Sequence, residues 1–189
     1  MTVIPAGTEV SFRITYLEMQ DDPGLNAPAL PEGVHLAHAV NPPVWFFLTM
    51  YEAVGRDYEW RDRFDQAEKD PETLAAFVSD PLVEMWVAYA KGWPQGFFML
   101  DWREAGTCDL AYFGLVPEAV GTGLGGSLLR TAIAKGWARP DVLKMTVNTC
   151  TLDHPRALDL YKKMGFRPVA IEDRTRVLHR DRDTSLHPA

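Results

Sequence analysis

Apolar and polar positions in the first half of the chain indicate one strand followed by helices. Residues Val10 to Met19 are rich in aromatic and β-branched side chains, which predicts a β-strand, and the Pro- and Gly-rich residues after them predict a loop. Two prolines then precede the apolar run Val44 to Val54, which predicts a helix with proline in its first turn. The charged residues Arg56 to Asp70 predict a polar helix or an ordered loop, and a new helix is expected to begin after Asp70.

Three short apolar runs follow, at Met85 to Ala90, Gly96 to Trp102 and Thr107 to Leu115. Gly92-Trp93-Pro94 separates the first run from the second, and Glu104-Ala105-Gly106 separates the second from the third. Short apolar runs divided by Gly and Pro are typical of antiparallel neighbours in a sheet. These residues therefore predict an antiparallel meander.

The last third of the chain predicts alternating helices and strands. The expected elements are a long helix (Gly123 to Ala138), a strand (Val142 to Asn148), a helix (about Pro155 to Met164) and two strands (around Phe166 to Ile171 and Thr175 to His179) that flank a turn at Glu172-Asp173. Helices first, then a meander, then alternating elements predict a mixed α/β sheet in a single domain covering residues 1–189. Asp181 to Ala189 are expected to form a flexible, frayed tail.

Composition and charge exclude several classes of protein. With 19 basic and 26 acidic side chains the net charge is −7, so we expect no nucleic-acid partner. The two cysteines, Cys108 and Cys150, have no metal-ligand spacing and form no disulfide framework, so we expect no metal site. The sequence has neither a signal-peptide pattern nor an apolar run long enough to span a bilayer, so a cytoplasmic protein without a membrane partner is expected.

A glycine-rich segment at the start of an expected apolar helix is the most informative part of the chain. Gly121, Gly123, Gly125 and Gly126 would let a ligand approach the backbone closely. The unpaired N–H groups in the first turn of a helix, together with its positive dipole end, suit a phosphate group. A flexible turn that only joins a strand to a helix would also use such glycines.

Residues Gly121 to Gly126 also match the G-x-G-x-x-G pattern of dinucleotide-binding folds. Those folds need the glycine turn directly after a strand, but Val116 to Val120 intervene here. They also expect an acidic residue at the end of the next strand, where this chain has Asn148-Thr149-Cys150. A dinucleotide site is therefore the less favoured interpretation.

Two motifs together resemble those of a different phosphate-binding family. Gly123 and Gly125 fill the glycine positions of a Gln/Arg-x-x-Gly-x-Gly/Ala pattern, and Leu115-Val116-Pro117 precedes it as a hydrophobic-x-Pro strand end. Further on, Ala157 to Phe166 match an A-x-x-L-Y-x-x-x-G-F signature. With both motifs in this order, residues 84–171 resemble the GNAT N-acetyltransferases.

The resemblance implies a GNAT-like fold, with a central, mostly antiparallel, twisted sheet and helices on both faces. It also implies transfer of an acetyl group from acetyl-CoA to an amine by direct attack. The implied phosphate contacts are Gly121, Thr122, Gly123, Leu124, Gly125 and Gly126, and the pantetheine arm would pair along Phe113, Gly114 and Leu115. Val120 stands where the family has Gln or Arg, which implies somewhat weaker cofactor binding.

Three catalytic roles follow from the resemblance. A bulge of the family's fourth strand, expected at Phe113-Gly114-Leu115, would free the Leu115 N–H to hold the thioester carbonyl oxygen. Tyr161 stands where family members place the acid that protonates the CoA sulfur, and a core tyrosine is the alternative. Asp109 is in register with the glutamate base of some members. A solvated role for Asp109, with a chain of waters as the base, is the alternative.

His154 occupies a position often held by an asparagine that contacts pantetheine, and a cap for the helix near Pro155 is the alternative. The acceptor pocket should come from the first two helices and the strands facing them, where the candidates are Tyr51, Trp60 and Tyr112. The acceptor would be a small-molecule or peptide amine, and edge strands of such folds can pair into a homodimer. A non-catalytic acyl-CoA-binding or sensing module is the alternative function.

Overall fold

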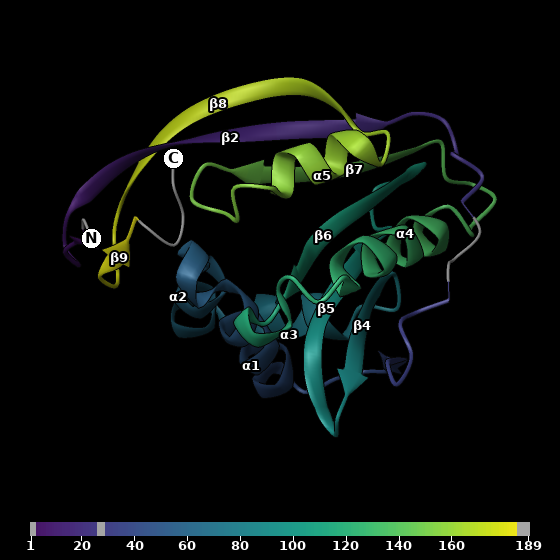
Figure 1. Cartoon of the computed structure of the whole chain (residues 1–189), viewed down its shortest axis with the longest axis horizontal. Helices are drawn as coiled ribbons and strands as arrows, with labels where there is room; N and C mark the ends of the chain where they lie inside the picture. The colour runs from purple at the N-terminus through teal and green to yellow at the C-terminus, as the bar shows by residue number, and fades with distance from the viewer. Residues whose placement is uncertain (1–2, 26–28, 185–189) are drawn as a thin grey trace.

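A seven-stranded, mostly antiparallel sheet in the order β3-β4-β5-β6-β7-β2-β8 organises the chain (Figure 1). The computed structural model describes residues 3–25 and 29–184. The strands are β2 (Glu9–Met19), β3 (His35–Ala39), β4 (Val83–Ala90), β5 (Trp93–Asp101), β6 (Thr107–Leu115), β7 (Lys144–Cys150) and β8 (Arg167–Val177). Among these strands only β6 and β7 pair in parallel. The predicted antiparallel meander is β4-β5-β6.

Helices cover both faces of the sheet, as predicted (Figure 1). One face carries α1 (Val44–Gly55), α2 (Asp62–Lys69) and α3 (Pro71–Ser79), with the 3-10 helix η1 (Arg56–Tyr58) after α1. The other face carries α4 (Leu124–Gly136) and α5 (Ala157–Lys163), and the 3-10 helix η2 (Pro117–Ala119) precedes α4. Asp70 starts α3 by accepting a hydrogen bond from the Thr73 N–H at 3.1 Å.

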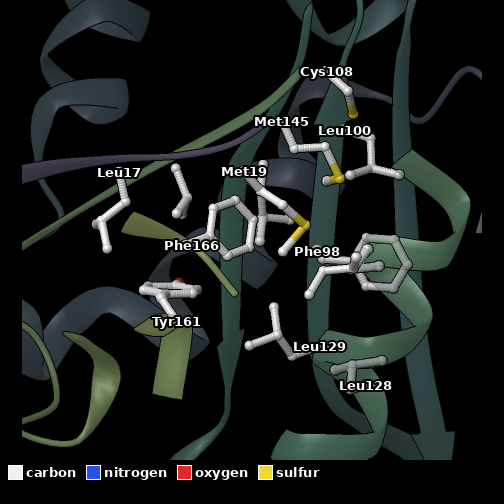
Figure 2. Packing of buried hydrophobic residues seen from close by; sticks show 14 of the residues in the cluster. Leu17, Met19, Phe98, Leu100, Cys108, Leu128, Leu129, Met145, Tyr161 and Phe166 are labelled. Atoms are coloured by element: carbon white, nitrogen blue, oxygen red, sulfur yellow. The ribbon is translucent and has the colours of Figure 1, made fainter. Parts of the chain in front are cut away.

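The core lies in two layers because successive side chains of β5 point to opposite faces. Phe98 and Leu100 pack towards α4, whereas Phe97 and Met99 pack towards α1 and α3. The central strands are thus buried on both faces, which explains why their sequence is continuously apolar. Figure 2 shows the layer on the α4–α5 side, where Tyr161 lies among these apolar side chains.

The strands β6 and β7 pair over only three positions, from Thr107 opposite Lys144 to Asp109 opposite Thr146. Beyond Asp109 they diverge, while β7 stays paired with β2 (Figure 1). The end of β6 from Leu110 to Leu115 therefore has β5 on one side and no strand on the other. This gap between β6 and β7 positions the site described below.

The last long strand differs from the sequence prediction. β8 runs from Arg167 to Val177 without a break, so the predicted turn at Glu172-Asp173 is wrong. Polar residues stand there because β8 is an exposed edge strand whose side chains pair with those of β2. Arg13 donates to Asp173 at 2.8 Å, and the Tyr16 hydroxyl donates to Glu172 at 2.9 Å. At an exposed edge, consecutive charges do not require a turn.

The C-terminal residues also differ from the prediction. The short strand β9 (Arg182–Asp183) pairs with β1 (Val3–Ile4), and the Arg182 side chain is 8% exposed. The expected frayed tail is therefore wrong for these residues, and residues 185–189 lie outside the described part of the chain.

The sequence pattern also does not predict β3, whose five residues pair with β4. Across residues 3–25 and 29–184, no helix combines the length and apolarity needed to cross a bilayer.

Candidate functional site

A cavity of about 1090 Å³ occupies the gap between β6 and β7 and is lined from both faces of the sheet. We call one part the glycine-loop half, which is lined by Val120, the four loop glycines, Arg156 and α5. The other part is the aromatic half, which is lined by α1, η1, Trp60, the start of α2, Tyr112 of β6, and strands β2 and β8. A molecule bound on one face of the sheet can therefore reach a molecule bound on the other.

The glycine-loop half ends in a backbone whose N–H groups suit an anion. Gly121 and Gly123 have φ angles of 84° and 88°, which favour glycine, and α4 begins directly afterwards without a side-chain cap. An added Cβ at Gly121, Gly123 or Gly126 would meet no atom within 4 Å, so the space over the loop is open. The first N–H groups of α4 have no partner within the helix and face a ligand at its positive end.

Two members of the predicted loop contribute only through their backbone. The Leu124 side chain is 2% exposed and packs in the core, and the Thr122 hydroxyl donates to the Ala119 carbonyl at 2.8 Å. Neither side chain lines the cavity, whereas Gly121, Gly123, Gly125 and Gly126 do. The loop therefore presents N–H groups and bare glycines to the ligand.

Basic side chains on the same half were not predicted from the sequence. Arg156 and Lys163 line the cavity immediately before α5 and at its end. Arg156 directly precedes the Ala157 to Phe166 motif and Lys163 lies within it, so the motif could have pointed to both residues. Their positive charges suit phosphate groups and could compensate for the missing anchor at Val120.

The free edge of β6 offers backbone groups to the gap. The Val116 N–H donates to the Gln95 carbonyl of β5 at 2.9 Å. Hydrogen-bonded positions alternate along an antiparallel pair, so Phe113 and Leu115 direct their N–H and C=O groups away from β5. An extended ligand could pair with this edge as a strand would.

The bulge of β6 is not where the sequence predicted it. Met99 pairs with Tyr112 and Leu100 pairs with Leu110, so Ala111 is the extra residue, and the prediction of a bulge at 113–115 is wrong. Gly114 has another role, because an added Cβ would lie 2.3 Å from Val54 Cγ1 of α1. The glycine lets α1 pack closely on the strand, and the Leu115 N–H faces the gap through ordinary alternation.

Tyr161 lies on α5 and lines the cavity with a side chain only 6% exposed (Figure 2). Its ring stands edge-on to Phe113 and Phe166, with centroids 6.3 and 6.0 Å away. Burial raises the pKa of the phenol, and the nearby carboxylates of Asp153 and Asp109 raise it further. The residue thus both packs in the core and presents a protonated hydroxyl, which can act as an acid but not as a base at neutral pH.

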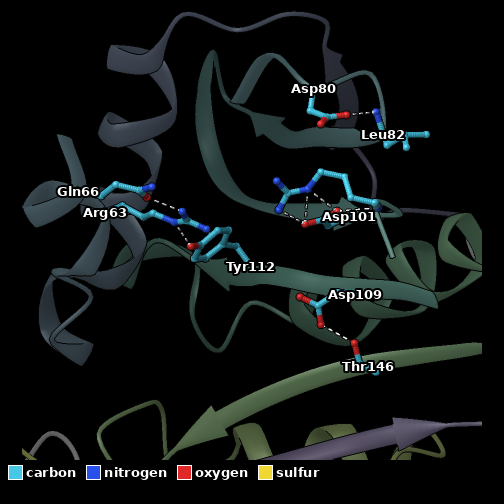
Figure 3. A network of polar contacts seen from close by, with 9 residues as sticks. Arg63, Gln66, Asp80, Leu82, Asp101, Asp109, Tyr112 and Thr146 are labelled. Carbon is cyan, nitrogen blue, oxygen red and sulfur yellow. Dashed lines mark hydrogen bonds and ion pairs between the residues drawn. The ribbon is translucent and has the colours of Figure 1, made fainter. Parts of the chain in front are cut away.

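Asp109 lies at the apex of the gap, where the pairing of β6 with β7 ends. The Thr146 hydroxyl donates to its carboxylate at 2.6 Å (Figure 3). Burial raises the pKa of Asp109, the bond from Thr146 opposes this, and two nearby carboxylates add to the rise. Asp109 lines a second cavity of about 590 Å³, which shares Asn148 with the main cavity. The structure therefore places Asp109 beside the main cavity and not in its lining.

The aromatic half brings together the three residues predicted to bind substrate. The rings of Tyr51, Trp60 and Tyr112 have centroids 5.4 to 5.7 Å apart, and all three line the cavity. Arg63 fixes the position of Tyr112 in this cluster, because its Nε donates to the Tyr112 hydroxyl at 2.5 Å (Figure 3). Burial raises the pKa of both tyrosines, although Arg63 opposes the rise at Tyr112. These phenols are protonated hydrogen-bond donors at neutral pH.

Asp153, which the sequence analysis did not single out, connects Trp60 of the aromatic half to the end of β7. Its carboxylate accepts from the Trp60 indole N–H at 3.0 Å, and from the Thr149 hydroxyl and the Cys150 N–H at 2.8 Å each. The next residue, His154, lines the cavity and accepts from the Arg156 N–H through Nδ1 at 3.2 Å. No motif marks Asp153, because its partner Trp60 is distant in sequence.

The side chains that commonly bind metal ions do not cluster in the described residues. Across residues 3–25 and 29–184, no group of three or more His, Cys, Asp or Glu side chains is arranged to hold a metal ion.

Known proteins share this architecture. Residues 47–166 match the acetyltransferase (GNAT) family. A GCN5-related N-acetyltransferase from Kribbella flavida is 18% identical, with a TM-score of 0.57 over 86% of this chain and 56% of that one. One from Sphaerobacter thermophilus is 19% identical, with a TM-score of 0.59 over 94% and 53%. A tandem GNAT protein from the clavulanic acid biosynthesis pathway is 18% identical, with a TM-score of 0.63 over 92% and 54%. No curated protein sequence matches the chain.

The three solved structures are similar in fold, and this chain spans little more than half of the length of each. The sheet order and its mostly antiparallel pairing differ from the parallel sheet of dinucleotide-binding folds, so the alternative interpretation of the glycine loop is not supported. The family match covers well over half of the sequence and includes the diverging strands, the glycine loop and α5. The chain belongs to the GNAT family of acetyltransferases.

Proposed function

We propose that this protein transfers an acetyl group from acetyl-CoA to the amine of a small molecule or peptide. The observation that carries the proposal is the continuous cavity through the gap between β6 and β7. An anion-binding loop lies on one side of it, aromatic side chains lie on the other, and the Tyr161 side chain lines it.

The residues of the glycine-loop half fit the cofactor. The N–H groups at Gly121 to Gly126, with Arg156 and Lys163, would hold its phosphates, and the edge of β6 would pair with its amide-bearing arm. His154 stands beside the same part of the cavity. When bound, acetyl-CoA supplies an activated acetyl group as a thioester.

In the proposed reaction the neutral amine attacks the thioester carbonyl directly, so a C–N bond forms as the C–S bond breaks. The Leu115 N–H would stabilise the developing negative charge on the carbonyl oxygen, a contribution of about 3 kcal/mol in other systems. Tyr161 would give its proton to the departing sulfur. Cys150 also lines the cavity, but burial raises the pKa of its thiol to about 12, which supports direct attack over an acyl-cysteine route.

Asp109 is the proposed base that removes a proton from the acceptor's ammonium group, which gives the neutral amine that attacks. Its position at the apex of the gap, outside the lining of the main cavity, suggests transfer through a water molecule near Asn148. Burial raises the pKa of Asp109, which makes it a better proton acceptor than an exposed aspartate.

Calorimetric titration with acetyl-CoA, with NADH as the control ligand, tests the proposal. We expect micromolar binding of acetyl-CoA, no heat from NADH, and release of free thiol when amines are added. The absence of acetyl-CoA binding would overturn the proposal.

The second candidate is a non-catalytic acyl-CoA-binding module, which the hydrophobic Val120 in place of a polar anchor favours. Such a module would bind acetyl-CoA but release no thiol with any amine.

A further inference from the structure

The C-terminal segment Arg176–Arg182 packs against the aromatic half of the cavity. The Arg182 guanidinium donates to two backbone carbonyls, at 3.2 Å to Asp57 and at 2.9 Å to Leu152. Asp57 belongs to η1, whereas Leu152 belongs to the loop between β7 and α5. One nearly buried side chain thus joins η1 to the β7–α5 loop, two segments that carry or adjoin residues lining the cavity.

Other bonds hold the η1 wall from the same segment. Arg176 donates to the Glu59 carbonyl at 2.6 Å and to the Asp62 carboxylate at 3.0 Å. The His179 N–H donates to the Glu59 carboxylate at 3.1 Å. Glu59 is 6% exposed and has a φ of 60°, a left-handed conformation that glycine would adopt more easily. This turn depends on outside support, which the C-terminal segment supplies.

The wall that these bonds hold carries the residues facing a bound acceptor. Tyr58 and Trp60 flank Glu59 and line the cavity. The segment is itself anchored, because Arg182 pairs with Ile4 between β9 and β1. The position of the aromatic wall is therefore set by residues distant in sequence.

We propose that Arg182 is a positioning residue that clamps the η1 wall to the β7–α5 loop and so restricts the acceptor to a small amine with an apolar body. This inference rests on the proposed function. The cavity of about 1090 Å³ must hold both the cofactor arm and the acceptor, which leaves room for one small molecule. The lining that the clamp holds includes the aromatic rings of Tyr58 and Trp60 as well as Glu59 and Asp62. The rings favour an acceptor with an apolar body over the flexible lysine of a protein chain.

Two substitutions test the clamp in the full chain. Arg182→Lys keeps the charge but cannot bond two carbonyls with one planar group, and Arg182→Gln removes the charge as well. We expect the KM for 2-phenylethylamine to rise about tenfold or more in both, with kcat changed much less. The affinity for acetyl-CoA, measured by calorimetry, should change less than about twofold. Both variants should also become less selective, so that kcat/KM for a lysine peptide rises relative to kcat/KM for 2-phenylethylamine. Arg167→Gln, the same change at an exposed position of β8, is the matched control.

Hydrogen exchange on the folded protein keeps the test independent of catalysis. Amides of residues 56–62 should exchange at least about tenfold faster in Arg182→Lys than in the wild type, with the β5 amides unchanged. Unchanged exchange there, or a wild type that prefers the lysine peptide, would overturn the inference. A wild type that binds no acetyl-CoA would overturn the proposed function instead, and the exchange result would still decide whether Arg182 holds the wall.

Discussion

The two halves of the cavity are built in opposite ways. The glycine-loop half comes from two local segments, the glycine loop and α5 with Arg156 before it, and the loop offers mostly backbone N–H groups. The aromatic half comes from α1, η1, the start of α2, β2, β6 and β8, and offers side chains. Backbone N–H groups can bind the phosphates that every acyl-CoA shares. Side chains brought together from several elements can instead select one particular acceptor. Under the proposed function, the cofactor site would therefore depend mainly on local sequence, and the acceptor site on tertiary structure.

The largest expected effect comes from Gly125→Glu in the glycine-loop half. Its carboxylate would repel the phosphates at the start of α4, so we expect acetyl-CoA affinity to fall more than about 100-fold by calorimetry. In Gly125→Ala the Cβ would lie 3.6 Å from Leu115 Cδ1, an ordinary contact, so a much smaller loss is expected from this control. Normal binding by the Glu variant would show that the phosphates bind elsewhere.

Tyr161→Phe tests the reacting centre between the halves. It removes the proton donor but keeps the ring between Phe113 and Phe166, so turnover should fall roughly ten- to a thousandfold with unchanged acetyl-CoA affinity and melting temperature. Because burial raises the pKa of Tyr161 above that of a free phenol, its ionisation should cause no loss of wild-type activity up to about pH 9. Full turnover in the Phe variant would remove Tyr161 from the mechanism.

Asp109→Asn separates a base from a structural carboxylate. We expect turnover to fall about 100-fold, while Asp101→Asn in the same smaller cavity changes it little. The pKa of Asp109 is raised in the folded state, so the folded protein holds this proton more tightly than the unfolded chain does. Its contribution to stability therefore decreases as pH rises from about 3.9 through the raised pKa, and the Asn variant should lose this dependence in melting curves. Unchanged turnover would favour water alone as the base.

The smallest effect is expected from Trp60→Phe in the aromatic half. The change removes the indole N–H bond to Asp153, worth about 1.5–3 kcal/mol for a charged partner, and shrinks the ring. The acceptor KM should rise several-fold while acetyl-CoA affinity is kept. Trp93→Phe, the same change at the exposed first residue of β5, should alter neither constant. An equal loss of acetyl-CoA affinity in Trp60→Phe would show that the two halves are not separable.

Sequence patterns predicted the elements whose signals are local. The meander, the long helix after the glycine loop and the α5 motif each have their periodicity or caps within a few residues. The same reasoning failed at β8, where an exposed edge strand tolerates charges that resemble a turn, and at Arg182, where a polar tail residue is buried by distant carbonyls. The bulge at Ala111 was missed because the register depends on the partner strand.

The sequence by itself determined the family motifs, the glycine-rich backbone before α4 and the position of Tyr161 on its helix, because each depends on neighbours along the chain. Only the tertiary structure decided which side chains line the aromatic half of the cavity. Trp60 meets Asp153, and Arg182 meets both Asp57 and Leu152, across separations for which a single sequence carries no pattern. Those contacts form because burial requires each polar group to find a partner, wherever in the chain that partner lies.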